Sequence, residues 1–321
     1  MKYIFSIFAV TCIALALYFF GQTQFQLNRI YTSLGENRLF SDEERAFSPP
    51  PQLLDEIIAR PLTYLDRGKQ SFVFLSADKR FVVKFFDTSA KKESRLLSKL
   101  ALVDKIWDFC ADLLQNFESM CIHLVEKFCS KDTKKHNFSD QMEFRKKSSI
   151  GKIKKIVAGY LIAKRSPLQN GALVLVEPSP NPRLFGKFAT LKDRFGFSHT
   201  IDLSKVPFII QYKAIPTRVM VTEALQKGDV EQAKQILHKI FAMYQEEHAH
   251  GIYDRDHNFM YNTGFIGDKP VRIDLGRVRE KELMKDPEIS RQEMQILFKR
   301  LEGWLERHFP VYRDRVCSGV C

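Results

Sequence analysis

The segment from 250 to 276, HGIYDRDHNFMYNTGFIGDKPVRIDLG, decides how the rest of this sequence is interpreted. It gathers acidic and amide side chains beside residues typical of strands. Asp274 follows a short apolar strand pattern and precedes a glycine, so we expect a carboxylate at the end of a buried strand. Carboxylate and amide oxygens are the ligands that hard cations prefer in proteins. Asp274 and Asn262 are therefore candidate metal ligands, and Asp256, upstream of both, is free to orient a hydroxyl group.

The order of the motifs in this segment resembles that of the protein kinase-like superfamily. The residues 250–256, HGIYDRD, look like the entry to the catalytic loop, Asn262 looks like the metal-binding asparagine downstream, and the DLG of 274–276 looks like DFG with leucine for phenylalanine. The resemblance implies that Asp256 accepts a proton from the acceptor hydroxyl. It also implies that Asn262 and Asp274 hold Mg²⁺.

The N-terminal half contains segments that match the nucleotide-binding parts of such proteins. The residues 65–73, LDRGKQSFV, resemble the glycine-rich phosphate loop, with only the middle glycine kept as Gly68 and with Ser71 in place of another. Lys84, at the end of a strand-like VVK, resembles the lysine that pairs with nucleotide phosphates. The residues 208–214 would be the strand and hinge that hold the adenine. ATP and Mg²⁺ are therefore the cofactors that the resemblance implies.

The sequence departs from the kinase pattern in the spacing of its catalytic residues. Asp256 and Asn262 are six residues apart, where the family usually has five, which a one-residue bulge would explain. The alternative pair, Asp254 and Asn258, is four apart and fits no better. The glutamate that should pair with Lys84 is not identified by the sequence, and Glu93 and Glu118 are the candidates.

The C-terminal part is short for a kinase. Only 45 residues follow Gly276, too few for an activation segment and the helical platform that binds protein substrates. We therefore expect a small or membrane-associated acceptor. The superfamily members it most resembles are compact, membrane-anchored bacterial proteins.

The chain begins with an apolar segment. Residues 3–20 carry no charge, and eighteen residues suffice to span a bilayer as a helix. This run is longer than the core of a secretory signal, about 7–15 residues, so we expect an uncleaved single-pass anchor. A cleaved signal at the small-residue site 14–16 is the alternative.

The predicted class is α+β, with a two-lobed kinase-like fold behind this anchor or signal helix. The expected divisions are the anchor, a linker with a proline spacer, a β-rich N-lobe carrying a basic insertion, and a truncated helical C-lobe: 1–20, 21–52, 53–215 with the insertion near 127–155, and 216–321. Strands are expected at 72–75, 81–86, 172–176 and 208–212, and a helix over roughly 92–128. Two more helices should start after the caps Asp229 and Asp286.

The net charge of +12 favours anionic partners. We interpret the insertion at 127–155 as a solvated loop, with contact to an anionic lipid surface as the sharper alternative. No recognition motif for nucleic acid accompanies the charge, so we expect the membrane and a nucleotide, rather than nucleic acid, as partners.

Two functions follow. The first is a membrane-anchored, ATP- and Mg²⁺-dependent phosphotransferase. The second is a catalytically inactive kinase-like module, a pseudokinase, that binds a nucleotide or a partner, which the altered spacing and the reduced glycine loop favour. The side of the membrane is not resolved by flanking charges, but ATP-dependent activity prefers the body on the cytoplasmic side.

Overall fold

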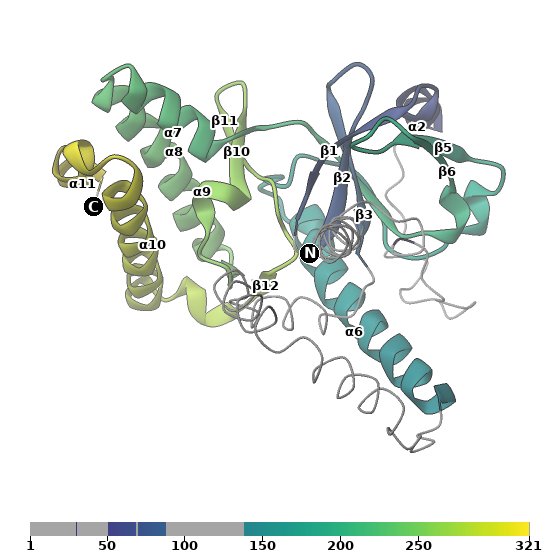
Figure 1. The fold of residues 1–321 in the computed structure, drawn as a ribbon. Coiled ribbons are helices and arrows are strands. Elements are labelled where there is room, and N and C mark those ends of the chain that lie inside the picture. The colour runs from purple at the N-terminus through teal and green to yellow at the C-terminus, as the bar shows by residue number, and fades with distance from the viewer. Residues whose placement is uncertain (1–29, 31–50, 69, 88–137, 321) are drawn as a thin grey trace, which may run out of the picture. The chain divides into compact units, whose positions relative to one another are not determined.

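A computed structural model describes residues 30, 51–68, 70–87 and 138–320 (Figure 1). Contacts divide the chain into two units, one made of residues 1–88 and 153–321 and the other of residues 89–152. The first unit is a mixed α+β structure, as predicted. The helix expected over 92–128 lies outside the described residues.

The first unit contains one large sheet and two small ones. Its twelve strands are β1 (Leu62–Arg67), β2 (Ser71–Leu75), β3 (Phe81–Phe86), β4 (Leu173–Glu177), β5 (Phe188–Lys192), β6 (Ser198–Asp202), β7 (Phe208–Tyr212), β8 (Ile215–Pro216), β9 (Ile252–Asp254), β10 (Thr263–Ile266), β11 (Lys269–Arg272) and β12 (Val278–Glu280) among the described residues. The large sheet has the order β4-β7-β3-β2-β1-β5-β6. All its pairings are antiparallel except that of β1 with β5.

The strands predicted from the sequence are confirmed. β2 and β3 form the expected hairpin around the turn at residues 76–79, and β4 and β7 lie where apolar runs indicated them. β3 lies inside the sheet, paired with β2 on one side and β7 on the other, and all of its residues are buried. Lys84 is thus carried by a strand whose position is fixed by two neighbours.

Aromatic side chains build the core of this sheet. Phe74 stacks edge-on against Tyr64 and against Phe85, and Phe85 also contacts Phe208. The helix α2 (Pro51–Ile58) adds Leu54 and Ile57 to the same core. Most phenylalanines of the described part of the chain are therefore buried in hydrophobic cores.

The prediction of a solvated loop at 127–155 is wrong from residue 138 onward, because α6 (Phe138–Arg165) is one long helix. Residues 127–137 lie outside the described part. The helix forms because apolar side chains recur at helical spacing from Ile153 to Leu161 and are buried. Its C-terminal part thereby packs into the first unit and reaches the edge of the candidate site.

Helices form the C-terminal part. The α-helices of this part are α7 (Thr217–Gln226), α8 (Val230–Ala249), α9 (Phe259–Asn262), α10 (Pro287–His308) and α11 (Arg313–Val320), with the short 3-10 turns η5 (Glu282–Lys285) and η6 (Pro310–Tyr312). Two further 3-10 turns, η3 (Pro182–Leu184) and η4 (Leu203–Lys205), lie earlier, between β4 and β5 and between β6 and β7. Both predicted caps are confirmed, since Asp229 accepts the amide of Gln232 and Asp286 that of Glu288. The apolar faces of α7, α8, α10 and α11 share a second core.

Two small sheets lie beside these helices. One has the order β11-β10-β8 and the other pairs β12 with β9. Among the described residues, no helix is long and apolar enough to cross a membrane. The predicted anchor or signal helix at 1–20 lies outside them.

Candidate functional site

The two predicted metal ligands are brought together by the β10–β11 hairpin. Asn262 ends α9 just before β10, and its backbone oxygen accepts the amides of Ile273, at 2.7 Å, and Asp274, at 3.2 Å, beyond β11. The hairpin therefore folds residues that are twelve apart in the sequence onto each other. Both side chains can then serve one site.

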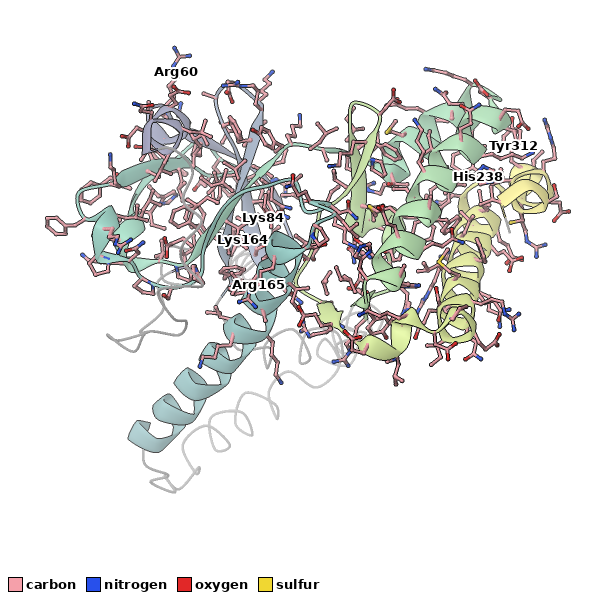
Figure 2. All side chains as sticks on the ribbon, turned by 180° about the vertical axis from the view of Figure 1, so that it is seen from behind. Arg60, Lys84, Lys164, Arg165, His238 and Tyr312 are labelled. Carbon is pink, nitrogen blue, oxygen red and sulfur yellow. The ribbon has the colours of Figure 1, made fainter. Side chains whose placement is uncertain are left out.

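Lys84 meets the same segment from the large sheet. Its Nζ donates a hydrogen bond to the backbone oxygen of Ile273 at 2.5 Å, although 189 residues separate the two in sequence. Burial lowers the pKa of Lys84 to about 8, and the negative charge of Asp274 opposes that shift. The lysine is only 4% exposed and lies where β3 meets the C-terminal part of α6 (Figure 2).

The helix α6 completes the surroundings of Lys84. The Nζ of Lys84 lies 5.8 Å from the ring centre of Tyr160, and burial together with Asp274 raises the pKa of that phenol well above its usual range. Gly159 is the contact point, because a Cβ there would clash with the backbone oxygen of Leu275. Glu93 and Glu118, the candidate partners of Lys84, lie outside the described residues.

Gly68 and Ser71 form a tight hairpin turn between β1 and β2. The amide of Gly68 donates to the backbone oxygen of Ser71 at 2.9 Å, and Ser71 pairs with Phe86 in the sheet. The turn folds onto the DLG segment, since a Cβ on Gly276 would clash with Oε1 of Gln70. That Oε1 is buried and has no hydrogen-bond partner in the described part of the chain. Gln70 lies within the predicted phosphate loop at 65–73, but the sequence pattern did not mark it as a site residue.

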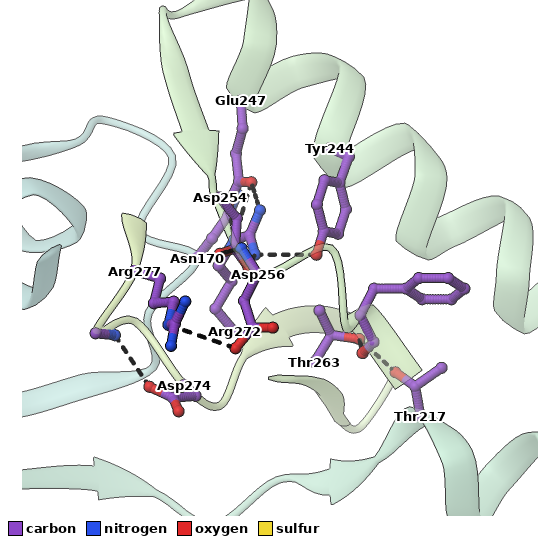
Figure 3. Close-up of polar contacts among 12 residues, drawn as sticks. Asn170, Thr217, Tyr244, Glu247, Asp254, Asp256, Thr263, Arg272, Asp274 and Arg277 are labelled. Atoms are coloured by element: carbon purple, nitrogen blue, oxygen red, sulfur yellow. Dashed lines mark hydrogen bonds and ion pairs between the residues drawn. The ribbon is translucent and has the colours of Figure 1, made fainter. Parts of the chain in front are cut away.

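The structure separates the two aspartates between which the sequence left a choice (Figure 3). Asp254 is buried and paired with Arg272 at 2.7 Å. Asp256 is 36% exposed, and its carboxylate lies 3.7 Å from Nε of Arg277. The amide of Asp256 donates to Oδ1 of Asp254 at 2.9 Å, so the buried residue holds the exposed one in place. Of these two aspartates, Asp256 is the one whose carboxylate is exposed to solvent.

A buried ionic cluster lies behind this loop, and the sequence analysis did not predict it. The guanidinium of Arg272 bonds to both oxygens of Glu247 and to Asp254, and its Nη1 also donates to Tyr244 at 3.1 Å. The backbone amide of Arg272 donates to the backbone oxygen of Asn170 at 2.7 Å. A usable signal was present: Glu247 falls three residues after Tyr244 on the otherwise apolar stripe of α8.

The donor set around Asn262 and Asp274 suits Mg²⁺ in chemical type. Oδ1 of Asp274 accepts the amide of Gly276 at 3.0 Å, which leaves Oδ2 for a cation. The buried Asn262 amide group makes no side-chain hydrogen bond within the described residues. No group of three or more His, Cys, Asp or Glu side chains in that part is placed to hold a metal. Two protein ligands would therefore leave the remaining positions to water and phosphate oxygens.

Surface hollows are found elsewhere. One of about 610 Å³ lies between α8 and α10, lined by Met294 and Phe298 among others, and one of about 400 Å³ lies beside the β10–β11 turn. Neither includes Lys84, Asp256 or Asp274. At the candidate site, Oε1 of Gln70 lies against Gly276 of the DLG segment.

The described residues thus define a mixed α+β protein in which Lys84, Asn262 and Asp274 meet beside the β10–β11 hairpin, while Asp256 contacts Arg277. No protein-family model matches the chain, and no curated protein matches it. Among solved structures, the Rv3197–erythromycin complex from Mycobacterium tuberculosis aligns at 13% identity with a TM-score of 0.32. The alignment covers 86% of this chain and 67% of that one. A likeness at this TM-score carries no argument about this chain.

Proposed function

We propose that this protein is a kinase-like phosphotransferase that uses ATP with Mg²⁺ and acts on a small or membrane-associated acceptor. The observation that carries the proposal is the contact between Lys84 and the Ile273–Asp274 segment. The buried Lys84 could bind phosphate oxygens, and the carboxylate of Asp274 and the side-chain oxygen of Asn262 could bind the metal ion that accompanies the phosphate.

The two-lobed kinase-like fold is part of this proposal. Lys84 lies on β3, the strand that carries the phosphate-binding lysine in protein kinases. β9 leads into the loop of Asp256 and pairs with β12, which follows the DLG segment, so the expected catalytic and metal-binding segments are neighbours. The large sheet and the helical part have separate hydrophobic cores, which agrees with two lobes.

In the proposed reaction, the acceptor hydroxyl oxygen forms a bond to the γ-phosphorus while the bond from that phosphorus to the β,γ-bridging oxygen breaks. The proton of the hydroxyl passes to the Asp256 carboxylate, and ADP leaves. Lys84 donates hydrogen bonds to phosphate oxygens, and Asn262 with Asp274 would hold Mg²⁺. The bound ion supplies neutralisation of the phosphate charge.

Nucleotide binding would change the contacts that Gly276 and Lys84 make in this structure. The turn at residues 68–70 must lift from Gly276, and Lys84 must exchange its bond to the Ile273 oxygen for a phosphate. The buried Oε1 of Gln70 has no partner to lose, so the turn departs without breaking a hydrogen bond of that oxygen.

The second candidate function is an inactive kinase-like module. The specific observation in its favour is that Tyr160, rather than a carboxylate, contacts Lys84 from α6 among the described residues. The turn at Gly68 also uses its amide within the hairpin rather than directing it toward a phosphate. Such a module would bind a nucleotide or a partner without turnover.

Calorimetric titration of the full chain with ATP, with and without Mg²⁺, tests the proposal. Lys84→Ala should weaken binding in both conditions, whereas Asp274→Asn should remove only the Mg²⁺ dependence. Asp256→Asn should leave binding unchanged and abolish ADP formation. Lys299→Ala, at an exposed lysine on α10, is the matched control.

The outcomes separate the two functions. Absence of heat and of a thermal shift at millimolar nucleotide rejects nucleotide binding altogether. Binding without ADP formation or transfer to any lipid, sugar or protein acceptor favours the inactive module. Reporter fusions at the C-terminus test the predicted membrane anchor and whether the body faces the cytoplasm.

A further inference from the structure

The β5–β6 hairpin at the edge of the large sheet and the turn just before it display phenylalanines to solvent. Phe185 is 85% exposed, Phe188 54%, Phe195 51% and Phe197 67%, all within thirteen residues. Large apolar side chains gathered on one exposed segment mark an interaction site more often than chance exposure does. This segment lies at the end of the sheet away from β4 and β7 and plays no part in the proposed chemistry.

The tip of the hairpin is a rigid loop. Oδ1 of Asp193 accepts the amides of Phe195 and Phe197, each at 2.9 Å, and the amide of Asp193 donates to the Phe197 oxygen at 2.9 Å. Gly196 takes a φ of +87°, which a side chain would strain. The backbone that carries these phenylalanines is therefore ordered in advance, which reduces the entropic cost of binding.

Positive charge surrounds these phenylalanines. Residues 182–200 contain four basic residues and one acid, Asp193, which is occupied by the loop amides and by His199 at 2.9 Å. Lys187 pairs with Asp55. The other three basic residues make no ion pair among the described residues: Arg183, Lys192 and Arg194.

We propose that the β5–β6 hairpin docks on an anionic lipid bilayer, with its phenylalanines in the interface and its basic residues at the headgroups. Exposed phenylalanine next to lysine and arginine is the composition of interfacial membrane segments. Single-stranded nucleic acid would instead need aromatic rings across the strand face for base stacking. The central outward pair here is Thr190 opposite Thr200, and the phenylalanines lie at the strand ends and the tip.

The test uses the full chain in vesicles and measures whether the side chain at position 197 enters the bilayer. Because residues 1–20 are a predicted anchor, sedimentation with vesicles does not report on the hairpin. Phe197→Trp supplies a fluorophore, and vesicles of phosphatidylcholine and phosphatidylserine with brominated acyl chains supply the quencher. The signal of the unmodified chain, with Trp107 and Trp304, is subtracted. Val311→Trp, at another site that is 83% exposed, is the matched control.

We expect quenching of the tryptophan at 197 and none at 311. Phe185→Trp is the second reporter, in case the substitution at 197 disturbs the loop. In the Phe197→Trp variant, the further substitutions Lys192→Gln and Arg194→Gln should lower the ratio of docked to undocked hairpin by about fivefold per charge removed. Added salt should act in the same direction.

Several results would overturn the proposal. These are no quenching at 185 and 197, equal quenching at 197 and 311, and equal quenching in vesicles of phosphatidylcholine alone. An emission change at 197 with polyuridylate, or with protein concentration alone, without lipid quenching would assign the surface to nucleic acid or to a second copy. The assay contains no nucleotide, so its outcome is independent of phosphotransferase activity.

Discussion

Arg272 donates from Nη1 to Oδ2 of Asp254 over 2.7 Å, and both side chains are almost fully buried. The other oxygen of Asp254 accepts the amide of Asp256. One ion pair therefore fixes the loop that presents the exposed carboxylate. Asp254 therefore has a structural role, and Asp256 stays available for the proposed proton transfer.

The first prediction compares alanine at these two aspartates. Asp254→Ala leaves Arg272 with one carboxylate partner and opens a space in the core, so we expect the free energy of unfolding to fall by about 2–3 kcal/mol. Asp256→Ala removes a partly exposed carboxylate whose ion pair with Arg277 is long, and should change it by less than about 0.5 kcal/mol. Urea unfolding of both variants measures the difference. Equal losses would contradict a division of roles.

The second prediction concerns Lys84 and gives opposite signs for stability and binding. The folded-state pKa of about 8 lies below the value of about 10.4 in an unfolded chain, so below pH 8 the charged lysine opposes folding. Lys84→Met removes that cost and loses the bond to the Ile273 oxygen, for a net gain of about 1–2 kcal/mol at neutral pH.

Thermal unfolding at neutral pH and near pH 10 measures this gain. The gain should shrink at the higher pH, where the unmodified lysine is neutral when folded. The same variant should bind nucleotide more weakly if Lys84 contacts phosphate. A loss of stability at neutral pH would indicate that the lysine is present for packing.

The fold was predicted where a segment carries its own periodicity or cap. β2, β3 and β7 are short apolar runs with turn residues beside them, and α8 and α10 begin at aspartates whose side chains accept first-turn amides. The edge hairpin β5–β6 was not predicted, because its alternation is short and its outward positions include phenylalanine. α6 was not predicted, because basic residues are interspersed with the apolar stripe that starts at Ile153.

The candidate site was predicted only in its polar members. Asp274, Asn262 and Lys84 could be singled out by residue type and order, and the structure brings them to one place. Tyr160 and Gln70 could not, since Tyr160 matters through its contact with Lys84, 76 positions away, and Gln70 through its contact with Gly276, 206 positions away. Long-range contacts of this kind depend on strand order and helix placement, which local patterns do not encode.

The third prediction tests the contact between α6 and the DLG segment with two glycines of one helix. A Cβ at Gly159 would clash with the Leu275 oxygen, whereas a Cβ at Gly151 meets no described atom within 4 Å. Gly151→Ala should therefore stabilise by about 0.5–1 kcal/mol, because alanine has the higher helix propensity. Gly159→Ala should destabilise by about 1–3 kcal/mol, because helix and segment must separate.

Chemical denaturation of the Gly151→Ala and Gly159→Ala variants measures both changes in the free energy of unfolding. The same separation should move Asp274 relative to Lys84, so Gly159→Ala should also weaken nucleotide binding while Gly151→Ala leaves it unchanged. A stabilising effect at both positions would show that α6 does not press on Leu275 in solution.

The fourth prediction is a pH dependence of stability from His248 on α8. Burial, and then the charge of Arg272, lower the pKa of His248 to about 4, while Glu293 opposes the shift. The unfolded value is about 6.5, so between pH 6.5 and 4 the unfolded chain binds more protons than the folded one. Stability should therefore fall by about 2 kcal/mol as the pH drops through this window.

Urea midpoints at about pH 7 and about pH 4.5 measure the fall, with His248→Gln as the control. Glutamine stays neutral and can keep a hydrogen bond to Ser290, which His248 contacts through Nδ1 at 2.9 Å. The other histidines and the carboxylates titrate in both chains, so the difference between the two slopes belongs to position 248. The glutamine variant should lose less stability than the unmodified chain. Identical slopes would mean that His248 is solvated enough to be protonated in the folded state.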